Sequence, residues 1–125
     1  MLEKSPFLKK DKIIENNHAF AIKDGFPISK GHSLIVPKRE ITSIYDLNSE
    51  EFSYFFLLSK QLIEILKNQY NPDAFNVGIN NGQYAGQTVA HAHMHVIPRY
   101  KGDVEDPRGG VRNIIPDKSG YLWKK

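Results

Sequence analysis

Three histidines alternate with apolar residues in the run His91-Ala92-His93-Met94-His95. Alternate residues of a β-strand lie on the same face, so a strand here would present three imidazoles side by side. Imidazole is partly neutral near pH 7, so its nitrogen can attack phosphorus while neighbouring imidazoles carry protons. The run therefore indicates nucleophilic and acid–base chemistry, with His93 as the nucleophile because a histidine stands on each side of it.

A metal site is the main alternative for these histidines. Two histidines separated by one residue on a strand lie about 6.6 Å apart along it and often chelate a cation. His91 and His95 would lie about 13 Å apart, which is too far for one tetrahedral ion to bind all three rings. A metal would need further ligands such as His18 or His32, and the chain has no cysteine and no HExxH motif. The residues therefore favour histidine catalysis and leave metal binding open.

The histidines need a sheet to hold them, and short apolar segments bounded by Asn, Gly and Pro predict one. Strands are expected over residues 13–15, 18–23, 33–36, 74–80 and 91–97. In the last strand the three histidines would share one face, while Ala92, Met94 and Val96 would face a packed layer. The hairpin-length connections favour antiparallel pairing, so we expect an α+β fold with an antiparallel five-stranded sheet and one long helix.

The long helix is predicted between Asn48 and Asn71. Asn48 and Glu51 have the spacing of a capping box, and Asn71-Pro72 would end the helix. Apolar side chains at steps of three and four residues would form one face that packs in the core: Phe52, Phe55, Phe56, Leu62, Ile63, Leu66 and Tyr70.

Length and composition favour one domain over residues 1–125. Within it we expect an N-terminal arm over 1–12, anchored by Phe7 and Leu8, and an extended C-terminal tail over 101–125. No apolar run resembles a signal peptide or spans a bilayer, which predicts a cytoplasmic protein with no membrane partner. The formal net charge of +3 suits an anionic small molecule and does not require nucleic acid.

The segment 91–97 matches a family signature in which three histidines alternate with apolar residues, and the sequence here resembles the histidine triad (HIT) family. The Gly-Gln-Thr-Val stretch at 86–89 and the segment 31–38 around His32 resemble two further family blocks. The resemblance covers roughly residues 18–100. Pro98-Arg99-Tyr100 after the triad is most similar to the fragile histidine triad branch and to bacterial dinucleoside polyphosphate hydrolases.

The resemblance implies both an assembly and a reaction. Family sheets join across a homodimer, and members transfer or hydrolyse nucleotidyl groups of diadenosine polyphosphates or adenosine phosphoramidates through a covalent nucleotidyl-histidine. Carried over by position, His93 would be the nucleophile. His91 and His95 would hold it and contact the α-phosphate and the leaving group, and His32 would support His91.

Four further residues would contact an adenosine nucleotide if the resemblance holds. Asp24 would accept hydrogen bonds from the ribose hydroxyls, and Asn80, Gln87 and Thr88 would donate to phosphate oxygens. The cysteines that hold zinc in many bacterial relatives are absent, so we expect no metal ligands and no required cofactor, although Mg²⁺ could accompany a polyphosphate. A nucleotide-binding regulatory protein with little turnover and a metal-dependent hydrolase remain the alternatives.

Overall fold

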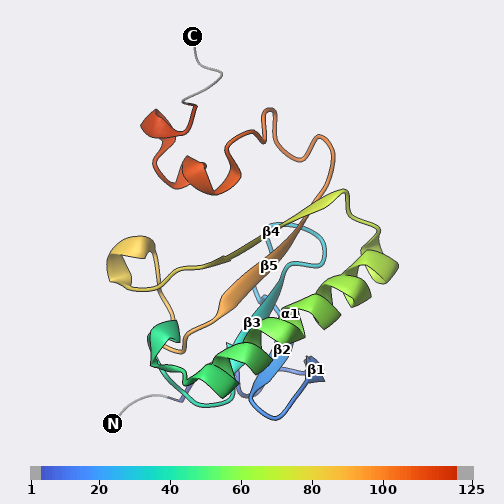
Figure 1. Ribbon diagram of the computed structural model, residues 1–125. Coiled ribbons are helices and arrows are strands. Elements are labelled where there is room, and N and C mark those ends of the chain that lie inside the picture. Colours follow the sequence, from blue (N-terminus) through green and yellow to red (C-terminus); the bar gives the residue numbers. More distant parts are fainter. Residues whose placement is uncertain (1–3, 121–125) are drawn as a thin grey trace.

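A single antiparallel sheet crossed by one long helix dominates the computed structural model, which describes residues 4–120 (Figure 1). The strands lie in the order β1-β2-β3-β5-β4, and every neighbouring pair is antiparallel. Their bounds are β1 Lys12–Glu15, β2 Ala19–Lys23, β3 Ser33–Pro37, β4 Ala74–Ile79 and β5 Met94–Arg99. The predicted α+β fold with five antiparallel strands is confirmed.

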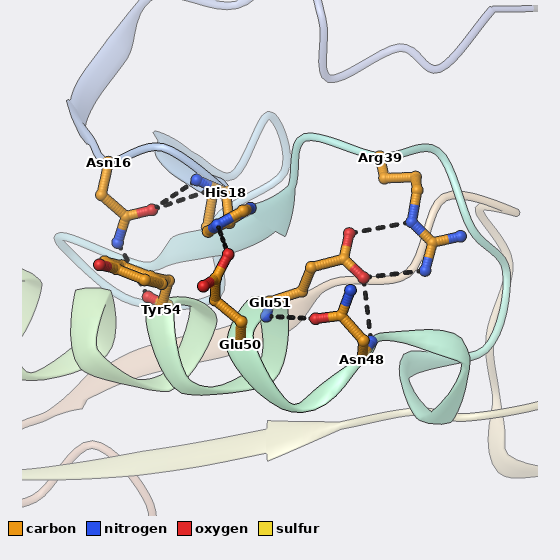
Figure 2. Close-up of polar contacts among 8 residues, drawn as sticks. Asn16, His18, Arg39, Asn48, Glu50, Glu51 and Tyr54 are labelled. Atoms are coloured by element: carbon orange, nitrogen blue, oxygen red, sulfur yellow. Dashed lines mark hydrogen bonds and ion pairs between the residues drawn. The ribbon is translucent and has the colours of Figure 1, made fainter.

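The helix α1, Ser49–Tyr70, begins at the predicted capping box (Figure 2). Asn48 Oδ1 accepts from the Glu51 amide at 2.8 Å, and a Glu51 carboxylate oxygen accepts from the Asn48 amide at 2.9 Å. Glu51 also binds the Arg39 guanidinium through both oxygens, which lowers the Glu51 pKa to about 2. Arg39 follows β3, so this pair ties the helix start to the segment that leaves the sheet.

Apolar side chains cover both faces of the sheet. On the α1 side, the helix residues Phe55, Leu58, Leu62 and Leu66 pack against strand residues such as Met94. The expected helix face is wrong at one position, because Phe56 is 47% exposed while Leu58 is buried. Steps of three and four residues from Phe55 lead to Leu58 and Leu62, which leaves Phe56 about 100° away from that line.

A second apolar cluster lies on the sheet face opposite α1. Its buried members are Phe7, Phe20, Ile22, Leu34 and Val36, with Val89 packed against them. Phe7 anchors the N-terminal arm as predicted, but Leu8 is 39% exposed and does not. This face carries the candidate site described below.

The last strand differs from its predicted bounds of 91–97. It begins at Met94, so His91 and His93 lie in an irregular segment before it, and it continues through Pro98 to Arg99. Proline has no amide proton and cannot donate a hydrogen bond to a neighbouring strand. Pro98 is tolerated because β3 pairs only with residues 94–96 of β5, so no hydrogen bond to β3 is lost at Pro98.

The C-terminal region is less extended than expected for 101–125. Two short 3₁₀ helices, η3 Gly110–Ile114 and η4 Pro116–Lys118, follow an irregular stretch, and residues 121–125 lie outside the described part. Two more 3₁₀ turns, η1 Ile44–Asp46 and η2 Gln83–Ala85, stand in connections. Within residues 4–120, no helix has the length and apolar character needed to cross a bilayer.

Candidate active site

A pocket of about 250 Å³ opens on the sheet face opposite α1. Its lining includes six of the eight residues singled out from the sequence: Asp24, Asn80, Gln87, Thr88, His93 and His95. The apolar side chains of Ile22, Leu34 and Val89 complete one wall. A shallower hollow of about 400 Å³ beside the start of α1 contains none of the expected residues. The fold therefore gathers most of the predicted site from four separate segments.

His93 lines this pocket directly before β5 and is 9% exposed. Its Nδ1 atom lies 2.8 Å from the carbonyl oxygen of His91. A carbonyl oxygen only accepts hydrogen bonds, so in the neutral ring Nδ1 carries the proton and Nε2 keeps its lone pair. Phe7 packs edge-on against the same ring, with 5.0 Å between ring centroids. His93 therefore offers an unprotonated nitrogen in a fixed ring, as a nucleophile requires.

His91 is buried, and both of its ring nitrogens are engaged. Nε2 lies 2.7 Å from the Pro37 carbonyl oxygen, and Nδ1 lies 2.6 Å from Ser5 Oγ. Burial lowers the pKa of His91, so the ring is neutral at pH 7. The expectation that the His91 ring contacts the α-phosphate is therefore wrong, because neither nitrogen is left for a substrate. His91 holds His93 through its main-chain carbonyl instead.

His32 supports His95 and not His91, which corrects a second expectation. His32 Nε2 lies 2.9 Å from His95 Nδ1. The register explains this pairing: Leu34 pairs with His95, and His32 is two residues before Leu34, so both side chains stand on the pocket face. His91 precedes β5, and its ring nitrogens contact Pro37 and Ser5 instead of His32.

The proton positions in the His32–His95 pair follow from a backbone contact. The Ile28 amide donates to His32 Nδ1 at 3.1 Å, so His32 carries its proton on Nε2. That proton is donated to His95 Nδ1, so neutral His95 carries its own proton on Nε2, and its ring lines the pocket. His95 can therefore donate a hydrogen bond to a bound substrate, while His93 can attack it.

Burial keeps this pair neutral at pH 7. Burial, followed by the nearby His93 and His32 rings, lowers the pKa of His95 to about 4 against the opposing effect of Asp24. Burial also lowers the pKa of His32, although the Asp24 carboxylate oxygen 3.2 Å from Nε2 acts in the opposite direction. Each neutral imidazole can donate one hydrogen bond and accept another.

The candidate ligands for a metal ion are Asp24, His32 and His95. Their donor atoms all lie within 4.8 Å of one another. A histidine that binds a metal normally donates its other N–H to an acceptor. Here the other nitrogen of His32 accepts a backbone hydrogen bond from Ile28, so the atom facing the cluster carries a proton. The surroundings of His32 therefore favour the hydrogen-bonded pair over metal ligation.

The four side chains expected to contact the substrate differ in their exposure and in the hydrogen bonds that they make. The Gln87 amide is used within its own loop: Oε1 accepts from the Gly82 amide at 2.9 Å, and Nε2 donates to the Thr42 and Val89 carbonyls at 3.0 Å. Gln87 therefore shapes the loop beside the pocket, and its donation to phosphate stays a prediction. Asn80 and Thr88 are exposed at the pocket, and their roles stay predictions.

Asp24 combines a structural contact with its expected place at the pocket. Oδ1 accepts from the Phe26 amide at 2.8 Å and shapes the turn after β2, while Oδ2 faces His32. Its contact with ribose stays a prediction, since the pocket lies beside the carboxylate.

The contact between Ser5 and His91 is the one that the sequence did not predict. Ser5 lies 86 residues from His91, and no local pattern links a serine in an arm to a distant histidine. The apolar wall could have been found, because Ile22 and Leu34 occupy alternating positions on strands that face the pocket.

The family described as the HIT domain matches residues 6–102. A 16.1 kDa HIT-like protein of Mycoplasma pneumoniae is 38% identical over 94 residues, which are 75% of this chain and 65% of that protein. A bis(5′-adenosyl)-triphosphatase of Dictyostelium discoideum is 38% identical over 88 residues, covering 70% of this chain and 59% of that protein.

A solved structure shares the same fold. The diadenosine triphosphate hydrolase of Plasmodium falciparum, in complex with cyclomarin A, superposes with a TM-score of 0.73 at 31% identity. The match covers 78% of this chain and 67% of that one. The chain thus spans about two thirds of the length of the proteins it is compared with here.

Proposed function

The chain belongs to the HIT family, and we propose from this premise that it cleaves adenosine nucleotides at the α-phosphate. The substrate class would be diadenosine polyphosphates or adenosine phosphoramidates. The Dictyostelium and Plasmodium relatives are named for hydrolysis of diadenosine triphosphate, which supports diadenosine polyphosphates as the substrate class.

The observation that carries the proposal is the orientation of His93. Its Nδ1 proton is held by the His91 carbonyl at 2.8 Å, so Nε2 is the attacking atom. Attack at the α-phosphorus forms an Nε2–P bond and breaks the bond to the leaving group. The ring becomes cationic in this step, and the carbonyl that accepts the Nδ1 proton stabilises that charge. A covalent nucleotidyl-histidine results.

His95 assists departure of the leaving group as a hydrogen-bond donor. Its Nε2–H donates to the departing oxygen or nitrogen and stabilises the charge that develops there, and the leaving group takes its proton from solvent. Water then attacks phosphorus, the Nε2–P bond breaks, the proton of the water goes to solvent, and AMP and neutral His93 are released. His32 Nε2, 2.9 Å from His95 Nδ1, holds the ring in the required orientation throughout.

The pocket lining suits the two ends of an adenosine monophosphate group. Ile22, Leu34 and Val89 offer an apolar wall for a planar base, and Asp24 stands where ribose hydroxyls could donate to it. Thr88 and Asn80 lie on the same pocket and would contact phosphate oxygens. No metal is required by this mechanism, although Mg²⁺ could neutralise a polyphosphate.

The assembly proposed is a homodimer with two-fold symmetry. The strand β4 is an edge of the sheet, and its residue Val77 is 43% exposed. An exposed edge strand is a ready site for pairing with a second copy. A cytoplasmic location stays a prediction.

A rate comparison on the purified protein tests the proposed reaction. Diadenosine triphosphate, diadenosine tetraphosphate, AMP-amide and adenylated lysine are supplied side by side, and AMP release is measured. Rapid quenching should trap a nucleotidyl adduct on His93 that is stable to base and labile to acid. AMP binding without turnover of all four substrates would contradict the proposal and favour a nucleotide-binding protein.

A further inference from the structure

Ser5 lies in the N-terminal arm, before β1, and is 9% exposed. Its Oγ atom is 2.6 Å from His91 Nδ1 and accepts from the Phe7 amide at 3.2 Å. Its own amide donates to a Glu40 carboxylate oxygen at 3.0 Å. These three hydrogen bonds hold Ser5 in contact with His91 of the histidine run.

The direction of the Ser5–His91 hydrogen bond follows from the other side of the ring. His91 Nε2 faces the Pro37 carbonyl, which can only accept, so Nε2 carries the ring proton. In the neutral imidazole Nδ1 is then an acceptor, and the Ser5 hydroxyl must donate. Without this hydroxyl, a buried ring nitrogen would lose its partner, which is costly in a site closed to water.

This contact reaches the nucleophile through the main chain. The His91 ring is clamped between Ser5 and Pro37, and the same residue supplies the carbonyl that holds the Nδ1 proton of His93. Phe7, two residues after Ser5, packs edge-on against the His93 ring. The segment 5–7 thus contacts both His91, whose carbonyl orients the nucleophile, and His93, the nucleophile itself.

We propose that Ser5 is a positioning residue for the reaction at His93, acting through His91. The inference rests on the proposed function for its effect on rate. Ser5 does not line the pocket, so it acts on the chemical step and leaves nucleotide binding largely unchanged.

The kinetic test compares Ser5→Ala with Ser5→Thr, which keeps the hydroxyl. For Ser5→Ala we expect kcat to fall roughly tenfold, the size of one lost hydrogen bond, with KM and AMP affinity within about twofold. Ser5→Thr should recover most of kcat. The matched control is Ser59→Ala, which removes another buried hydroxyl that bonds the Phe56 carbonyl at 2.6 Å within α1. It should leave kcat unchanged.

A spectroscopic test does not depend on turnover. Long-range ¹H–¹⁵N correlation spectra of the histidine rings report which nitrogen carries the proton. We expect His93 to be protonated on Nδ1 in the wild type and to show a larger share of the Nε2 form in Ser5→Ala. If the wild type turned over no nucleotide, the proposed function would fail while this spectral shift still tested the role of Ser5.

Two outcomes would overturn the positioning role. One is a Ser5→Ala protein with kcat within twofold of wild type and an unchanged His93 spectrum. The other is an equal loss of kcat in Ser59→Ala, which would show a general effect of lost stability. If Ser5→Ala did not fold, Ser5→Cys would replace it: a thiol is a weak donor, so kcat should fall between the values for serine and those for alanine, and an unchanged kcat would count against the proposal.

Discussion

The Nδ1 atom of His93 lies 2.8 Å from the main-chain carbonyl oxygen of His91. The backbone two residues earlier therefore determines which nitrogen of His93 is free to react. The His91 ring contacts Ser5 and Pro37, and in the proposed mechanism these contacts hold this carbonyl in place. His91 and His93 thus have different roles in the proposed mechanism, although they belong to one motif.

Replacing His93 by alanine should abolish turnover and spare binding. Loss of a covalent nucleophile typically costs three or more orders of magnitude in rate. AMP affinity, measured by calorimetry, should stay within about threefold because the pocket walls remain. The control is His18→Ala, since His18 contacts Glu50 at the start of α1, away from the pocket (Figure 2). Near-wild-type turnover of every adenosine substrate by His93→Ala would rule out this nucleophile.

Replacing His95 by alanine should make the rate depend strongly on the leaving group. With a basic leaving group, loss of the Nε2 hydrogen bond to the departing atom should slow turnover by roughly 10²-fold or more. With an acidic phenol as leaving group, which departs without this hydrogen bond, the loss should stay below about tenfold. Steady-state rates on both kinds of adenosine 5′-phosphoester test this, and equal losses on the two would exclude His95 as the donor to the leaving group.

Metal removal should leave the reaction on AMP-amide nearly intact, because His93 supplies the nucleophile and no step uses a cation. Purified protein is dialysed against chelator, and AMP release is compared with that of untreated protein. Full loss of activity, restored by zinc alone, would favour the metal-dependent hydrolase and a ligand set around Asp24, His32 and His95.

In solution the protein should behave as a dimer, with a mass near twice the chain mass of 14.3 kDa. Light scattering at micromolar concentration measures this directly. Val77→Lys, which places a charge on the exposed edge strand β4, should shift the mass toward the single chain. A monomer in the wild type would refute the expected assembly.

Stability should fall as the pH is lowered from 6.5 toward 4. His95 has a folded pKa of about 4, below its ordinary value, so the unfolded chain takes up a proton first and is favoured over this range. The full contribution is present above pH 6.5, and its size is on the order of 3 kcal/mol for this shift. Urea unfolding at several pH values measures the slope, and His95→Gln should reduce it. An identical slope in that variant would contradict the assignment.

The strands and the helix could be located from the sequence because their signals are local. The capping box at Asn48, the αL residue Asn71 and the alternation in β2 and β3 all act within a few residues. Type and spacing also marked His93 and His95, while Asp24, Asn80 and Thr88 came from the resemblance to the HIT family. Which ring contacts which residue could not be predicted, because the His32–His95 pair depends on the register between β3 and β5.

The start of β5 was misplaced for a related reason. Alternation from His91 onward is the pattern of a strand, but the His91 ring finds its partners in Ser5 and Pro37 and the Ala92 amide donates to the Ile41 carbonyl. These tertiary contacts bend the chain before Met94. The hydrogen bonds that Gln87 makes to its own loop and to the Thr42 carbonyl could not be predicted for the same reason.

The hydrogen bond between Ser5 and His91 joins residues 86 positions apart, which sets an order of events during synthesis. The arm leaves the ribosome first, yet its partner is added only after β1 to β4 and α1 have been made. Closing so long a loop carries an entropic cost that is repaid when the sheet is in place. The nucleophile is therefore oriented late in folding, and nascent chains shorter than about residue 93 carry no competent site.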